Sequence, residues 1–129
     1  MANILVDTNI IIDYLRQKNK SKSIFFKIFS QKENKAFVAL VTVAELWAGK
    51  SAAQKKTSQL LEKIINGCQV LIPSLNTAKK TGELLRQTNY NLSYQDAQIA
   101  ALSLENKLEV LTFNQKDFKK VKKVRLYTL

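Results

Sequence analysis

The chain has 129 residues, a hydrophobic fraction of 46% and a formal net charge of +11, from 21 Lys and Arg against 10 Asp and Glu; these values fit one folded domain over residues 1–129. It contains no histidine and one cysteine, Cys68, which excludes His bases, His-containing zinc sites, thiolate metal cages and internal disulfides. No apolar run reaches the ~18 residues of a membrane span, and the N-terminus lacks the features of a signal peptide, so we expect a cytoplasmic protein with no membrane partner.

Short apolar runs alternate with helical patterns along the chain, which is typical of an α/β domain with a largely parallel sheet. The first half predicts a strand over 3–6, helices over 10–16 and 21–31, a strand over 37–41, helices over 42–49 and 54–66, and a strand over 69–72. The second half predicts helices over 74–88 and 93–106, a strand over 108–112, a short helix over 115–120 and an edge strand over 124–127. We therefore expect a mostly parallel central sheet of about five strands, flanked by helices.

Four of the ten acidic residues occupy special places in this pattern. Asp7 follows the first strand, Glu45 lies in the first helical turn after the second strand, and Asp117 lies shortly after the fourth. Asp96 begins the helix that leads into that fourth strand. Because residues beyond the carboxyl ends of parallel strands meet in one crevice, we expect these four carboxylates to share one site.

Each acid also has a purely structural explanation. Asp7 can cap the helix that follows it, and Asp117 can lie in the first turn of its own helix, where the helix dipole favours an acid. The segments 42–45 and 93–96 both fit a capping box, with a hydroxyl residue three positions before an acid. Such caps are worth about 1 kcal/mol and need no active site. What favours a shared site is the set, because independent caps have no reason to gather at one end of a sheet.

A cluster of carboxylates either has raised pKa values or requires a compensating cation, because two like charges 4 Å apart repel by about 4 kcal/mol at an effective dielectric constant near 20. Without His or paired Cys the ligands are oxygens only, which suits Mg²⁺, or Mn²⁺ as a substitute, better than Zn²⁺. The excess of positive charge favours a polyanionic partner such as a nucleic acid, although lysines also serve solubility alone. A metal in this pocket would lower the pKa of a water molecule that attacks a phosphodiester.

The motifs around the four acids resemble those of the PIN domain, in particular those of the bacterial VapC-type toxins of toxin–antitoxin pairs. The similarity is carried by ILVDTN at 4–9, TVAEL at 42–46, DAQIAA at 96–101 and LTFNQKDF at 111–118. Each motif is short, but the four occur in order and at suitable spacing along nearly the whole chain. The resemblance implies a single PIN-like domain that acts as a Mg²⁺-dependent endoribonuclease, with Asp7, Glu45, Asp96 and Asp117 as catalytic and metal-binding residues.

The resemblance also implies different roles for the four acids. Asp7 and Asp96 are expected to contact the metal directly, and Glu45 to act through a bound water. Asp117 departs from the pattern, because many relatives carry an acid nearer the strand end, where this chain has Asn114; this leaves open whether one or two metals bind. Hydrogen bonds that orient the ligands are expected from Thr8, Asn9 and Thr112.

The partners that the resemblance implies are an RNA substrate, a second copy of the chain in a homodimer, and a cognate antitoxin whose C-terminal segment covers the active site. An apolar groove for the antitoxin is expected from Ile24, Phe25, Ile28, Phe29, Leu46 and Trp47, of which Trp47 should be partly exposed; the same side chains can instead be core. The lysine-rich stretch 116–125 starts beside Asp117 and can position an RNA backbone or merely protect an edge strand. The alternative function is a non-catalytic, basic RNA-binding module with a degenerate acidic pocket.

Overall fold

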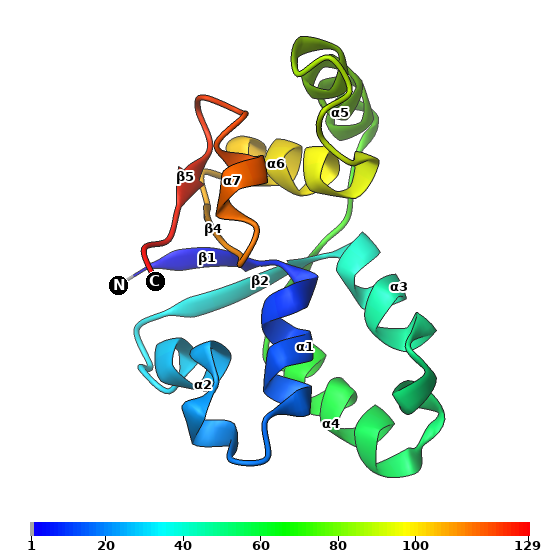
Figure 1. Cartoon of the computed structure of the whole chain (residues 1–129), viewed down its shortest axis with the longest axis vertical. Helices are drawn as coiled ribbons and strands as arrows, with labels where there is room; N and C mark the ends of the chain where they lie inside the picture. The colour runs from blue at the N-terminus through cyan, green and yellow to red at the C-terminus, as the bar shows by residue number, and fades with distance from the viewer. Residues whose placement is uncertain (1) are drawn as a thin grey trace.

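The computed structural model describes residues 2–129, which form an α/β domain with helices on both faces of a parallel sheet (Figure 1). The strands are β1 (Asn3–Val6), β2 (Lys35–Ala39), β3 (Gln69–Leu71), β4 (Glu109–Leu111) and β5 (Arg125–Leu126). Their order in the sheet is β3-β2-β1-β4-β5, and all neighbouring strands are parallel. The predicted fold class is therefore confirmed.

Two groups of helices sandwich the sheet (Figure 1). One face carries α1 (Thr8–Arg16), α2 (Ile24–Phe29), α3 (Leu40–Ala48) and α4 (Lys55–Asn66), with short 3₁₀ turns η1 (Lys20–Lys22) and η2 (Lys50–Ala53). The other face carries α5 (Leu75–Gln87), α6 (Tyr94–Asn106) and α7 (Gln115–Phe118). Within residues 2–129, no helix combines the length and the hydropathy that crossing a bilayer requires.

The alternation of side chains along the strands divides the core into two halves. In β1, Leu5 packs with Ala100 and Phe118 on the α6 and α7 side, whereas Ile4 and Val6 pack with the α1 to α4 side. All these side chains are almost completely buried. Burial of both faces explains why the strands read as continuous apolar runs in the sequence, as parallel strands do.

The order of the strands places a crevice beside the end of β1. The chain proceeds from β1 through β2 to β3 in one direction and then returns to β4 on the other side of β1. In open parallel sheets, such a reversal leaves a crevice at the carboxyl ends of the two central strands. The loops that follow β1 and β4 therefore meet, and the Asp7 backbone N–H donates to the Leu111 carbonyl oxygen at 2.9 Å.

Several predicted boundaries differ from the observed ones: α1 begins at Thr8 and not at residue 10, α7 ends at Phe118 and not at residue 120, and β2 covers Lys35–Ala39 and not 37–41. The helix predicted over 21–31 is divided at Ser23, whose buried hydroxyl caps α2 by accepting from the Phe26 N–H at 3.1 Å. The helix predicted to begin at Thr42 begins at Leu40, because β2 runs into it without a loop. Its N-cap is Ala39 with no side-chain cap, so the capping box predicted for 42–45 is wrong. By contrast, Ser93 does cap α6.

Candidate active site

Asp7 lies at the centre of the crevice, between the end of β1 and the start of α1. It caps α1: its Oδ1 accepts from the Thr8 N–H at 2.8 Å, and its Oδ2 accepts from the Thr112 hydroxyl at 2.7 Å. The residue is only 2% exposed. Burial raises the pKa of the Asp7 carboxyl above its ordinary value, and the hydrogen bonds from Thr112 and Thr8 oppose this shift. Asp7 is thus a buried carboxylate held in one orientation by two donors.

Glu45 reaches the same crevice from the second turn of α3. Its Oε1 accepts from the Thr8 hydroxyl at 2.7 Å and from the side-chain amide of Gln95, which lies at the start of α6. Thr8 Oγ1 is also hydrogen-bonded to the buried Thr42 Oγ1 at 3.1 Å. Since α3 and α6 lie on opposite faces of the sheet, Glu45 connects the two halves of the molecule at the strand ends.

Asp96 lies in the first turn of α6, where its backbone N–H donates to the Ser93 hydroxyl at 3.0 Å. Its pKa is raised from 3.8 to about 6, first by burial and then by the negative charges of Asp7 and Asp117, with a smaller contribution from Glu45; a hydrogen bond with Ser93 opposes the shift. The structure therefore brings all four predicted acids near enough to act on one titrating group.

Asp117 is the outermost of the four acids. It lies in α7, its side chain is 42% exposed, and its Oδ1 is 3.1 Å from the Lys120 ammonium. Lys120 also donates to the Asn91 carbonyl oxygen at 2.7 Å, which fixes it beside the acid. Asn114 occupies the position at which the family resemblance leads one to expect an acid. It is exposed, and its backbone N–H donates to Thr112 Oγ1 at 2.9 Å.

The oxygen donors of this crevice suit a hard divalent cation. In the described part of the chain, the two salt bridges join Lys80 to Glu83 and Lys120 to Asp117, so Asp7, Glu45 and Asp96 carry charges that no Lys or Arg compensates at close range. Across residues 2–129, no three Asp, Glu, Cys or His side chains are arranged closely enough to enclose a metal by themselves. Mg²⁺ usually keeps several waters and uses one or two carboxylates with substrate phosphates, so an open arrangement of this kind fits it.

Of the three residues expected to orient the acids by hydrogen bonds, two do so and one does not. Thr8 and Thr112 both donate to carboxylates of the crevice, as described above. Asn9 does not: its Oδ1 accepts from the Phe113 backbone N–H at 3.3 Å and so ties α1 to the loop after β4. Gln95 was missed, because a glutamine at the start of a helix looks like any polar surface residue and its contact with Glu45 spans 50 positions.

The lysine-rich stretch 116–125 does not form one continuous surface. Arg125 donates to a backbone carbonyl at the end of α6 at 3.0 Å. Lys116 and Lys119 line a cavity with the C-terminal residues, whereas Lys122 and Lys123 line another against α5 and α6. Lys120 contacts Asp117 at 3.1 Å and so lies beside the crevice.

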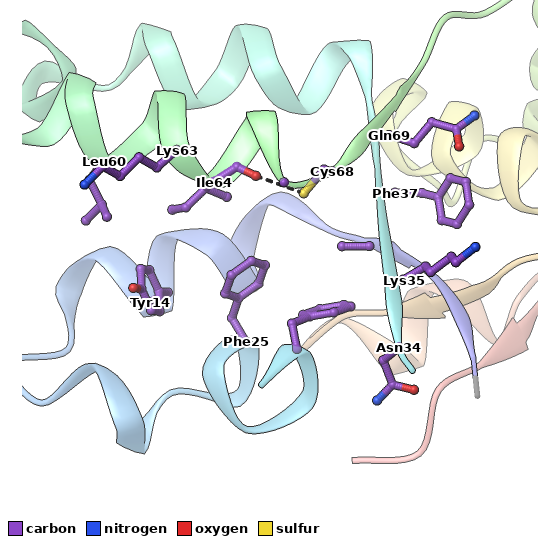
Figure 2. Close-up of a pocket in the computed structure, with 13 residues that line it drawn as sticks. Tyr14, Phe25, Asn34, Lys35, Phe37, Leu60, Lys63, Ile64, Cys68 and Gln69 are labelled. Carbon is purple, nitrogen blue, oxygen red and sulfur yellow. Dashed lines mark hydrogen bonds between the residues drawn. The ribbon is translucent and has the colours of Figure 1, made fainter. Parts of the chain in front are cut away.

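The apolar groove predicted from α2 and α3 is likewise divided, because α1 lies between these helices (Figure 1). Phe25 and Phe29 line a cavity of about 570 Å³ together with Tyr14 (Figure 2). Trp47 on α3 is 36% exposed, which confirms its predicted partial exposure, and lies apart from this cavity.

Cys68 lies in the same cavity and behaves as a structural residue. Its thiol donates to the Ile64 carbonyl oxygen at 3.2 Å (Figure 2). Burial raises the pKa of the Cys68 thiol to about 11. Since the thiolate is the reactive form, the raised pKa keeps the thiol protonated at neutral pH.

Comparison with known proteins identifies the family. Chains of similar fold occur in VapBC2 from Rickettsia felis bound to promoter DNA (22% identity, TM-score 0.81, 98% of both chains) and in DNA-bound VapBC from Salmonella typhimurium (25% identity, TM-score 0.81, 98% of both chains). VapC20 from Mycobacterium tuberculosis, a toxin that cleaves the sarcin–ricin loop, is also similar (15% identity, TM-score 0.72, 97% of this chain and 99% of that one). No curated protein matches. The PIN domain family model matches residues 4–124, a range that includes all four acidic motifs, and the chain therefore belongs to the PIN domain family.

Proposed function

We propose that this chain is a Mg²⁺-dependent endoribonuclease and the toxin of a type II toxin–antitoxin pair. One observation supports the proposal: Thr8 donates to both Asp7 and Glu45, and Gln95, the residue before Asp96, also donates to Glu45, so these acids border one crevice in a chain of net charge +11. Additional support comes from the VapC20 neighbour, which cleaves an RNA loop, and from the neighbours found in VapBC complexes. RNA of the same cell would be its substrate, in agreement with the predicted cytoplasmic location.

The residues that would hold Mg²⁺, or Mn²⁺ in its place, are Asp7, Glu45, Asp96 and Asp117. When bound, the metal supplies a water of lowered pKa and stabilises the negative charge that develops on the phosphate. Asp7 contributes a carboxylate whose orientation is set before any ligand binds, because Thr8 and Thr112 donate to its two oxygens. Preorganised charge of this kind is effective because no reorganisation is needed during the reaction.

The other acids would act in ways set by their contacts. Both hydrogen bonds to Glu45 use Oε1, so within the described chain its Oε2 is available to a bound water. With a pKa of about 6, Asp96 is ionised at neutral pH and protonated in mildly acidic solution. Protons would therefore compete with the metal for Asp96 as the pH falls.

Cleavage of a labelled RNA tests this function. We expect cleavage with Mg²⁺ or Mn²⁺, none in EDTA, and a loss greater than about 100-fold in Asp7→Asn, because even outer-shell partners of metal ligands are worth ~10–100-fold. Asp13→Asn is the matched control, since Asp13 lies on α1 and accepts only from Gln17, at 3.1 Å. Full activity of Asp7→Asn would contradict the assignment.

The alternative, a non-catalytic RNA-binding module, is favoured by the lack of three closely grouped metal-ligating side chains within residues 2–129. The same assay separates the two functions. A binding module would bind RNA equally well in EDTA and in Mg²⁺ and would cleave it in neither. Its affinity would still fall as the salt concentration rises.

We further propose an antitoxin partner, by analogy with the VapBC neighbours, and a homodimer, which the family resemblance implies. Large apolar side chains are exposed at the carboxyl-end side of the sheet: Leu40 follows β2, Ile72 follows β3, and Tyr94 begins α6. Exposed apolar groups of this size favour a protein interface, and the aromatic cavity around Tyr14 and Phe25 suits an apolar antitoxin segment. Two measurements test these partners. Adding the product of a small neighbouring gene should abolish cleavage, and the mass of the free protein in solution should equal that of two chains.

A further inference from the structure

A second cavity extends from Glu45 along α1 and α3 to α4, and we call it the α1–α4 groove. Figure 1 shows α1 and α3 leaving the strand ends together and running away from the sheet towards η2 and α4. The cavity has a volume of about 730 Å³, within the range of sites that take small ligands. Apolar side chains on three helices line it, namely Ile12, Leu15, Leu46 and Leu60.

Cationic side chains surround this apolar lining. Arg16 and Lys18 come from the end of α1, Lys50 from η2 and Lys56 from α4, and all four are exposed. Within residues 2–129 none of them forms a salt bridge. Glu45 is the one acidic residue that lines the groove, so the groove is strongly positive everywhere except where it meets the crevice.

A fifth cation, Lys20, has a different role. Its ammonium donates to the Tyr14 and Leu15 carbonyl oxygens, both at 2.8 Å, and lies 5.2 Å from the centre of the Tyr14 ring. Lys20 therefore provides a hydrogen-bond donor to carbonyl oxygens at the C-terminal end of α1, where the helix dipole favours a cation. Arg16 lies in the last turn of α1 and also interacts favourably with the helix dipole, whereas Lys18, Lys50 and Lys56 have no comparable contact in the described chain.

We propose that the α1–α4 groove binds the RNA strand on one side of the bond that is cleaved. This proposal rests on the proposed ribonuclease function and names the path of its substrate. Cations on both sides of the groove can bind consecutive phosphates, while the apolar lining contacts riboses and bases, as in other single-strand binding sites. A strand in this groove leads directly to Glu45 and the other carboxylates. An acidic protein segment would satisfy the cations equally, but continuity with the crevice favours the substrate.

Salt-dependent RNA binding tests this groove. The variant Arg16→Gln/Lys50→Gln/Lys56→Gln removes three of its charges. The matched control Lys27→Gln/Lys32→Gln/Lys79→Gln removes three exposed charges outside the groove. Affinity for a short single-stranded RNA of mixed sequence would be measured by fluorescence anisotropy in EDTA, so that no cleavage intervenes. The two variants have equal net charge, so a difference in affinity between them depends on where the charges lie.

We expect the groove variant to lose affinity and to have a weaker salt dependence. Each lost phosphate contact reduces the slope of log K against log[salt] by about 0.7. For three contacts, the advantage of the wild type over the groove variant should shrink about 20-fold between about 50 and 200 mM salt. The control variant should keep the wild-type slope. Equal slopes for the two variants would overturn the proposal.

Two further measurements separate this proposal from its alternatives. With Mg²⁺, the groove variant should have a raised KM for RNA. If the wild type cleaves RNA and the variant has the same KM, the groove does not bind the substrate, and the nuclease function is unaffected by this result. RNA binding through the groove without any cleavage by the wild type would reject the nuclease function instead. If the groove variant loses affinity for poly-glutamate but not for RNA, the groove belongs to an acidic protein segment and the RNA assignment is wrong.

Discussion

Replacing Thr112 by Val tests whether Asp7 is held in position by its hydrogen bonds. Thr112 is 1% exposed, and its hydroxyl donates to Asp7 Oδ2 at 2.7 Å. Valine keeps the shape of the side chain and removes the hydroxyl. A hydrogen bond to a charged group contributes about 1.5–3 kcal/mol, and the Asn114 N–H that loses its acceptor can bind water because Asn114 is exposed. We therefore expect the free energy of unfolding to fall by about 1.5–3 kcal/mol at neutral pH.

The loss should depend on pH, because the Thr112 bond favours the charged form of Asp7. At low pH, where Asp7 is protonated, the same bond is between neutral groups and is worth about 0.5–1.5 kcal/mol. Urea unfolding followed by the fluorescence of Trp47, the one tryptophan of the chain, measures both values. Cleavage of RNA should fall about 10–100-fold, as for other partners of metal ligands, and Thr112→Ser should restore it.

Thr81→Val is the matched control. Thr81 is also completely buried, and its hydroxyl donates to the Thr77 carbonyl oxygen at 2.7 Å within α5. We expect Thr81→Val to lose about 0.5–1.5 kcal/mol of stability and to keep full cleavage activity. Wild-type cleavage by Thr112→Val, or equal effects of the two variants on stability and on cleavage, would show that the Thr112 hydroxyl does not hold Asp7 in position.

Further predictions concern the other acids. Asp96→Asn should abolish cleavage yet stabilise the metal-free protein at neutral pH. Folding raises the pKa of Asp96 from 3.8 to about 6, so between these pH values the folded state binds more protons than the unfolded state. The wild type therefore loses stability as the pH rises from about 4 to above 6, and the variant does not. Urea unfolding at several pH values measures this; equal pH dependence of the two proteins would contradict it. Lys120→Met removes the cation beside Asp117 and should cost at most about 1 kcal/mol while tightening Mn²⁺ binding in a titration. Gln95→Ala frees Glu45 from one donor and should lower the cleavage rate about 10-fold without changing stability by more than about 1.5 kcal/mol in urea unfolding.

The features that could be predicted from the sequence are those that depend on residues close together in the chain. The apolar run before Asp7 predicted β1 with its observed bounds, and the helices predicted over 74–88 and 93–106 begin one residue later, after the N-caps Ser74 and Ser93. The location of the four acids followed from the strand ends, because parallel strands share one edge. The start of α3 was misplaced because Thr42 looks like a cap, whereas its hydroxyl is used in a contact with Thr8.

Features that depend on how distant segments pack could not be predicted. The Gln95–Glu45 contact joins opposite faces of the sheet, and no local pattern distinguishes Gln95 from other polar residues at a helix start. The α1–α4 groove depends on the placement of three helices, so the cations at Arg16, Lys50 and Lys56 are scattered in the sequence. The dense lysine stretch near the C-terminus was more visible, yet the fold distributes it over separate surfaces.

Binding of Mn²⁺, followed by electron paramagnetic resonance, tests most directly whether the crevice holds a divalent cation. We expect the wild type and Asp13→Asn to bind the ion equally, and Asp7→Asn and Asp96→Asn each to weaken binding by more than about 10-fold. Urea unfolding of the same variants would show that they are folded. Unchanged Mn²⁺ affinity in both folded variants would mean that the crevice does not hold the ion.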